Sequence, residues 1–77
     1  MTMEEIREDL KKRYYYAIES HDERIIDCTI AHMEYIIDKV RKDKQLAQSG
    51  IAADVLNMIV ILINSLYSHE FILKHYQ

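Results

Sequence analysis

Residues 51–67 read IAADVLNMIVILINSLY, and this stretch decides the fold. Two apolar stripes with the three- and four-residue spacing of a helix run through it and into the residues that follow. They consist of Val55, Ile59, Leu62 and Leu66, and of Leu56, Val60, Ile63, Tyr67 and Phe71. The polar side chains form a narrow line made of Asp54, Asn57, Asn64 and Ser68. A helix that is apolar nearly all round is normally enclosed, so we predict a core helix over residues 51–76.

The same stretch must be compared with a membrane span. Its length is at the short limit for crossing a bilayer, and it carries Asp54, whose charge is costly in hydrocarbon. Basic flanks are missing, and residues 69–75 return to amphipathic character. We therefore prefer a core helix at an interface between chains, and a short membrane-associated protein is an alternative.

A second helix is predicted just upstream, over residues 23–47. Its apolar residues alternate four and three apart, as in a heptad seam, and are Ile26, Ile30, Met33, Ile37 and Val40. Basic side chains crowd its last turns, where they complement the helix dipole. Gly50 follows, and a glycine in the left-handed backbone conformation commonly ends a helix, so we expect a left-handed stop there. Because so short a connection normally joins antiparallel neighbours, residues 23–76 are expected to form an αα-hairpin.

An N-terminal helix is predicted over residues 3–20. Thr2 followed by Glu5 fits a capping box. One apolar stripe of this helix consists of Met3, Ile6, Leu10, Tyr14 and Ala17. Ser20 or Asp22 offers a second N-cap, which predicts a turn or a kink at this point. Because no Gly or Pro enforces a break here, one long bent helix is the alternative.

The length of 77 residues corresponds to one domain, residues 1–77, near the size where a single core is only marginally sufficient. The lone cysteine, Cys28, cannot form an internal disulfide, so self-association is the simplest further source of stability. The predicted fold class is all-α, with an N-terminal helix plus an αα-hairpin in a three-helix chain that dimerises into a helical bundle. The predicted dimer interface consists of Val55, Leu56, Ile59, Leu62, Ile63 and Leu66.

Asn57 and Asn64 lie one heptad apart, and this spacing has two interpretations. In a seam between helices, a buried amide fixes register and oligomeric state. On a solvent-facing side, the two amides would simply belong to the polar line that Asp54 and Ser68 extend. We favour the second interpretation.

The net charge of the chain and its first five residues indicate where the protein is located and which ligands it attracts. The net charge is −3, which gives no bulk attraction to nucleic acid or to anionic membranes. Residues 1–5 lack the basic and apolar regions of a signal peptide. A single cysteine gives no sign of an oxidising compartment. We therefore expect a cytoplasmic protein.

No cofactor, metal site or catalytic centre is predicted. Cys28 and His32 are four residues apart on a helix, but structural zinc normally takes four ligands and catalytic zinc three. A buried Cys beside a partly exposed His is the preferred interpretation. The sequence has no glycine-rich phosphate loop, no serine in a nucleophile elbow and no Glu-x-x-His pair. We therefore expect a protein without enzymatic activity.

Residues 11–16, KKRYYY, place three cations directly before three aromatic rings. Such a run can grip phosphates and bases, so a nucleic-acid-binding helical dimer is an alternative function. Consecutive helical residues point in different directions, however, so three adjacent tyrosines cannot form one stacking platform. Tyrosine is also enriched at protein-protein hot spots. The predicted partner-binding residues are Arg13, Tyr14, Tyr15 and Tyr16.

Together these features predict a small protein-protein interaction module. It would act as a homodimer on a larger, unidentified protein, as an accessory regulator or inhibitor that works by occlusion or bridging. The short length, the acidity and the lack of a catalytic motif are typical of small regulators encoded by bacteria or phages.

Overall fold

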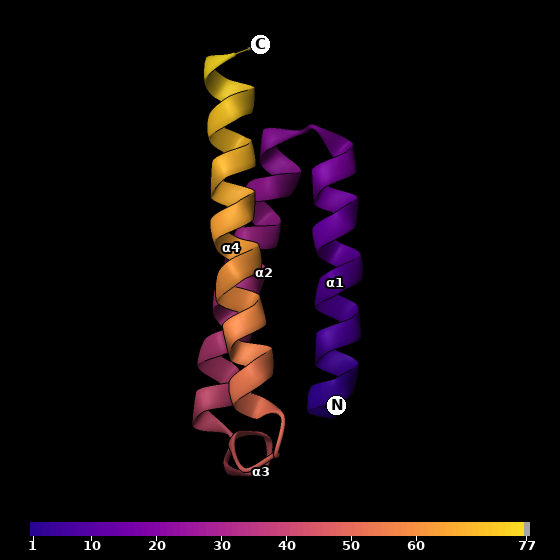
Figure 1. Cartoon of the computed structure of the whole chain (residues 1–77), viewed down its shortest axis with the longest axis vertical. Coiled ribbons are helices and arrows are strands. Elements are labelled where there is room, and N and C mark those ends of the chain that lie inside the picture. The colour runs from indigo at the N-terminus through magenta and orange to yellow at the C-terminus, as the bar shows by residue number, and fades with distance from the viewer. Residues whose placement is uncertain (77) are drawn as a thin grey trace.

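The computed structural model describes residues 1–76, which fold into one bundle of helices. In chain order these are α1 (Met3–Ser20), α2 (Glu23–Lys42), α3 (Lys44–Ala47) and α4 (Ala52–His75). The three long helices lie side by side, and α3 forms a short turn at one end (Figure 1). The described residues contain no strand, so the predicted all-α class is confirmed.

The chain runs up, down and up along the bundle. α1 and α4 point the same way, and α2 runs antiparallel to both (Figure 1). Each long helix contacts the other two, and the α2–α4 pair shares the most extensive contact. The bundle measures 43 × 17 × 16 Å. Because a helix of the length of α4 rises about 36 Å, α4 occupies most of the long axis.

The connection between α1 and α2 is a tight turn, so the two helices are separate and the alternative of one bent helix is wrong. The predicted capping box starts α1, with the Glu5 amide 3.1 Å from Thr2 Oγ1 and the Thr2 amide 2.9 Å from Glu5 Oε1. α1 ends at Ser20, and the next residue, His21, caps it in the left-handed conformation with φ 50°. Asp22 then caps α2 by accepting a hydrogen bond from the Arg24 amide at 2.9 Å.

The connection between α2 and α4 differs from the prediction in two places. The helix predicted over residues 23–47 breaks at Asp43, because the Asp43 carboxylate accepts hydrogen bonds from the amides of Gln45 and Leu46 and so starts α3. The left-handed stop expected at Gly50 is also wrong, since no described glycine has a positive φ. The chain turns instead through a hydrogen bond from the Ala52 amide to the Ser49 carbonyl, at 3.1 Å.

The core lies between the three long helices. The stripes predicted for α1 and α2 point into it, and their fully buried members are Met3, Ile6, Leu10, Ala17, Ile26, Ile30, Met33 and Val40. α4 contributes Ala52, Val55, Ile59, Ile63, Leu66 and Leu73. Tyr14 and Ile37, which we also assigned to these stripes, are half-buried at the edge of the core. Amphipathic spacing therefore positions α1 and α2 as expected.

The six residues predicted as the dimer interface are used for packing inside one chain. Val55, Ile59, Ile63 and Leu66 are buried between α1 and α2, and Leu56 and Leu62 are partly buried against the same core. α1 and α2 cover these residues within one chain, because the two helices contact α4 from two sides. A second chain could therefore reach the four buried residues only if the bundle opened.

Candidate interaction surfaces

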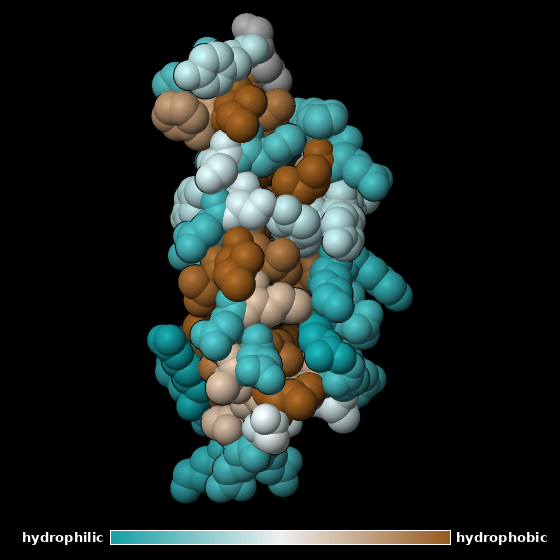
Figure 2. Space-filling model, in the orientation of Figure 1, coloured by the Kyte–Doolittle hydropathy of each residue, from teal (hydrophilic) through white to brown (hydrophobic). Residues whose placement is uncertain are grey.

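One face of α4 points away from α1 and α2 and carries large apolar side chains. We call this surface the outer face; it consists of Val60, Ile61, Tyr67, Phe71 and Ile72. These side chains are between 47% and 66% exposed. Figure 2 shows apolar atoms recurring along α4 between polar ones. Because apolar side chains gathered along one exposed helix face mark an interaction site more often than scattered ones do, the outer face is a candidate contact surface.

The polar line predicted on α4 lies within this exposed side of the helix. Asp54, Asn57, Asn64 and Ser68 are all exposed in the single chain. The two asparagines alternate with Val60 and Tyr67 at spacings of three and four, as along a heptad seam. The outer face is therefore apolar at its flanks and mixed along its centre.

The C-terminal end of α4 extends past the turn between α1 and α2 (Figure 1). Its rings cluster there, with the centroid of Phe71 4.2 Å from that of His75 and 6.5 Å from that of Tyr76. By length and apolar composition, α4 is also the one described helix that could cross a membrane. Two of its sides are already occupied by α1 and α2, and the helix carries Asp54, Glu70 and Lys74.

Glu70 is the one buried charged residue among those described, and it lies on the inner side of α4. Its pKa is raised, chiefly because a hydrogen bond with the carboxyl group of Asp27 favours the protonated form. Burial and the negative charge of Asp27 act in the same direction, and Lys74, whose Nζ lies 3.6 Å from Glu70 Oε1, opposes them. The contact between α2 and α4 therefore contains two neighbouring carboxyl groups.

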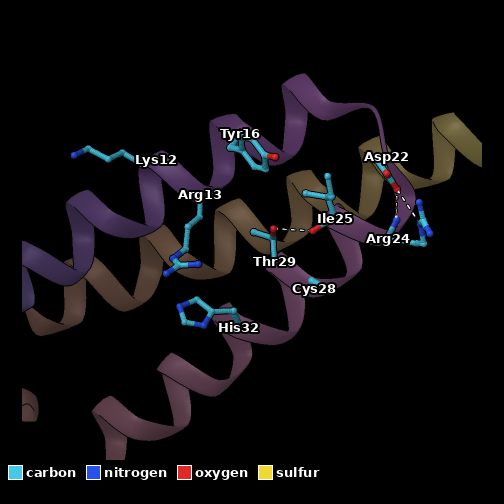
Figure 3. A pocket seen from close by; sticks show the side chains of 9 residues that line it. All are labelled: Lys12, Arg13, Tyr16, Asp22, Arg24, Ile25, Cys28, Thr29 and His32. Atoms are coloured by element: carbon cyan, nitrogen blue, oxygen red, sulfur yellow. Dashed lines mark hydrogen bonds and ion pairs between the residues drawn. The ribbon is translucent and has the colours of Figure 1, made fainter.

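A second surface is a groove of about 720 Å³ between α1 and α2. α1 contributes Lys12, Arg13 and Tyr16. The cap and the first half of α2 contribute Asp22, Arg24, Ile25, Cys28, Thr29 and His32. α4 passes behind the two helices, and the groove is open to solvent on the side facing the viewer (Figure 3). It is thus separate from the outer face.

The groove has cations on both walls. Arg13 Nε lies 2.8 Å from Asp9 Oδ2, and on the opposite wall Arg24 Nε lies 3.6 Å from Asp22 Oδ1. Within residues 1–76, Lys12 forms no ion pair. The lining therefore contains three cations, Lys12, Arg13 and Arg24, and one carboxylate, that of Asp22, although the chain as a whole is acidic.

His32 lies at the end of the groove, where the Arg13 side chain extends toward its imidazole ring (Figure 3). The pKa of His32 is lowered, first by burial and then by the positive charge of Arg13. The neutral imidazole is therefore favoured at neutral pH. Cys28 is exposed in the groove, so the expectation of a buried cysteine is wrong. The described residues contain no cluster of three or more His, Cys, Asp and Glu side chains that could hold a metal ion.

The four predicted partner-binding residues separate into three environments. Arg13 and Tyr16 line the groove. Tyr14 is half-buried, and its hydroxyl group is 2.7 Å from Ser65 Oγ of α4. Tyr15 is exposed, and its ring meets that of Tyr14 edge to face, with centroids 5.3 Å apart. They diverge because each residue of an α-helix is rotated by about 100° from the one before it.

The prediction missed the α2 wall of the groove. Ile25, Cys28, Thr29 and His32 recur at three- and four-residue spacing, which places them on one side of α2 beside the core stripe. The same spacing was available in the sequence. Spacing alone does not show which side of α2 stays open in the folded chain.

Comparison with protein-family models, with curated proteins and with solved structures finds no match to this chain. The function is therefore inferred from the geometry of its own residues.

Proposed function

We propose that this chain is a non-enzymatic protein-protein interaction module that pairs with a second copy of itself through the outer face of α4. The observation that carries the proposal is the exposure of five large apolar side chains on one face of a helix whose other sides are buried. Covering such a face stabilises a complex by about 25 cal/mol for each Å² of apolar surface removed from water. A second α4 is the simplest cover, since it offers the same length and the same pattern.

In the single chain Asn57 and Asn64 lie on the exposed polar line, and their heptad-like spacing there also fits a helix-to-helix contact. Asn57, Asn64 and Phe71 are seven residues apart, and Val60 and Tyr67 lie between them at the alternate positions. In a parallel pair in register each asparagine meets its own copy, and in an antiparallel pair Asn57 meets Asn64. Either arrangement satisfies the amides, whereas a shifted register leaves polar groups without partners.

The pairing we propose is modest in strength. One helix from each chain forms the contact, so the buried surface is expected near the lower end of specific interfaces, about 1,200 Å² in total. We therefore expect the dimer to dissociate on dilution. A weak, reversible dimer suits an accessory regulator that occludes or bridges a larger protein.

The proposal is tested by the solution mass, measured by light scattering after size exclusion without detergent over a range of micromolar concentrations. The mass of the unchanged chain is expected to rise from one chain toward two. Tyr67→Glu, on the outer face, is expected to keep it at one chain. Tyr35→Glu is the matched control, because Tyr35 is similarly exposed but lies on α2. Circular dichroism verifies that both variants stay helical.

Two outcomes would overturn self-association through α4. A monomer at every concentration would show that the outer face is not paired with a copy. An equal loss of dimer in Tyr67→Glu and Tyr35→Glu would show that the contact lies elsewhere or reflects charge alone.

Membrane association is the second candidate function, and the length and apolar composition of α4 favour it. It requires α4 to leave its packing against α1 and α2 or to lie on the bilayer by its outer face. Flotation with phospholipid vesicles distinguishes it from self-association. Migration of the chain with the vesicles, together with aggregation that only detergent relieves, would replace the first proposal by this one.

A further inference from the structure

The groove between α1 and α2 has the geometry of a binding site for a helix. Ile25 and Thr29 are half-buried along its α2 wall, Cys28 is exposed beside them, and Tyr16 stands on the α1 wall. α4 packs behind the same two helices (Figure 3). A helix seated in the groove would therefore contact α1 and α2 from the opposite side and complete a four-helix bundle.

The charge of the groove determines what kind of helix fits. Its cations are Lys12, Arg13 and Arg24, and the carboxylates paired with them are Asp22 in the lining and Asp9 beside it. The cations outnumber these carboxylates, whereas the whole chain has a net charge of −3. Complementary charge across an interface favours encounter and fixes orientation. The partner is therefore expected to be acidic.

The shape of the groove argues against a small molecule. Small-ligand sites usually bury most of the ligand surface, whereas this groove is open along its length (Figure 3). Nucleic acid binds chiefly through its phosphates, for which the groove offers three cations, whereas the apolar side chains of Tyr16 and Ile25 match a protein helix. An amphipathic helix lying in an apolar groove uses both the open length and the charged rims.

We propose that the groove between α1 and α2 binds an acidic amphipathic helix of a partner protein, with apolar side chains against Tyr16 and Ile25 and carboxylates against Lys12 and Arg13. This inference rests on the proposed role as an interaction module. It does not depend on self-association, because the outer face of α4 contributes nothing to the groove.

The probe for this proposal is a synthetic amphipathic helix of about the length of α1, with Leu along one face and Glu along both flanks. A second peptide, with Lys in place of Glu, serves as its control. Binding is measured by fluorescence anisotropy at low and at physiological salt. The acidic peptide is expected to bind, more tightly at low salt, and the basic peptide is expected to bind at least about tenfold more weakly.

Two neighbouring residues provide a matched pair of variants. Lys12 lines the groove, and Lys11, next to it on α1, does not. Lys12→Glu and Lys11→Glu change the net charge equally. Lys12→Glu is expected to weaken binding of the acidic peptide by about tenfold, and Lys11→Glu by less than about threefold. Equal losses would show a response to overall charge and would overturn the proposal.

Cys28 shows independently whether the peptide binds in the groove, because its thiol is exposed there. The acidic peptide is expected to slow the reaction of Cys28 with a thiol reagent, and modification of Cys28 by a bulky reagent is expected to block the peptide. Peptide binding that leaves the thiol fully reactive would place the peptide elsewhere. Displacement of the peptide by a single-stranded oligonucleotide would favour nucleic acid as the occupant and would overturn the proposal.

The same measurements on Tyr67→Glu separate this proposal from the proposed dimer. Retained peptide binding by that variant would support the groove even if the unchanged chain proves monomeric. Failure of the acidic peptide to bind a chain that does dimerise would overturn the groove proposal and leave self-association intact.

Discussion

The inner and outer faces of α4 are built from similar residues but differ in what covers them. Ile59 is fully buried against α1 and α2, whereas its neighbour Val60 is 47% exposed. The same contrast separates Leu66 from Tyr67. Hydrophobicity alone therefore does not decide which stripe of an apolar helix becomes core. The positions of α1 and α2 decide it, and the remaining stripe stays exposed in the single chain.

The largest expected effect comes from truncating neighbours on the two faces. Ile59→Ala removes buried methyl and methylene groups and leaves a cavity, so it is expected to lower the free energy of unfolding by about 2–5 kcal/mol. Val60→Ala, at concentrations where the chain is monomeric, is expected to change it by less than about 1 kcal/mol. Urea denaturation followed by circular dichroism measures both. Similar losses would mean that the outer face is also covered within the chain.

An intermediate loss of stability is expected from a substitution at the contact between α1 and α4. Tyr14→Phe removes the hydroxyl group that hydrogen-bonds with Ser65, which is expected to cost about 0.5–1.5 kcal/mol of unfolding free energy. Tyr15→Phe is the control, because the Tyr15 side chain is exposed and its hydroxyl group has no partner among the described residues. Thermal unfolding of the two variants measures the difference. A neutral Tyr14→Phe would contradict the assignment of Tyr14 to the fold.

The smallest expected effect concerns the one charged group on the inner face. The pKa of Glu70 is raised in the folded chain, so the folded state holds this proton more tightly than the unfolded state does. Its favourable contribution is complete below the unfolded pKa of about 4.5 and is lost as pH rises through the folded value. Glu70→Gln cannot ionise, so its melting temperature is expected to exceed that of the unchanged chain near neutral pH.

The pH dependence provides the control for Glu70→Gln. The advantage of the variant is expected to shrink as pH falls toward the unfolded pKa. An advantage that stays constant over this pH range would show that it does not come from the ionisation of Glu70. A variant that is less stable at neutral pH would show that the pair with Lys74 outweighs the repulsion from Asp27.

The local patterns predicted most of the fold because they rest on short-range physics. Thr2 and Glu5 form the capping box, and the stripes through Leu10 and Met33 face the core, because the stereochemistry of a helix fixes both relations. The break at Asp43 was missed because this residue lies within a mostly basic run, residues 39–44. Asp is a strong N-cap residue, but its carboxylate competes with continued helix, and the sequence alone does not decide between the two.

The candidate surfaces were predicted less well because they depend on how helices are placed. Arg13 and Tyr16 were predicted from the run of cations and aromatic rings at residues 11–16. That they line the groove while Tyr14 and Tyr15 do not follows from which side of α1 meets α4. The residues assigned to the dimer contact proved to be core for the same reason. Periodicity identifies the faces of a helix, and only the tertiary arrangement shows which face remains free.

The end of α4 that extends past the α1–α2 turn has a consequence for measurement. Backbone amides at frayed helix ends exchange hydrogen with solvent after local opening that costs almost no free energy, whereas core amides require global unfolding. The last turns, with exposed Phe71 and Ile72, should therefore exchange early, and the turns around Ile59 late. A second chain that covers Phe71 would slow exchange at this end first. Hydrogen exchange at the tip of α4 therefore measures the proposed pairing without any substitution.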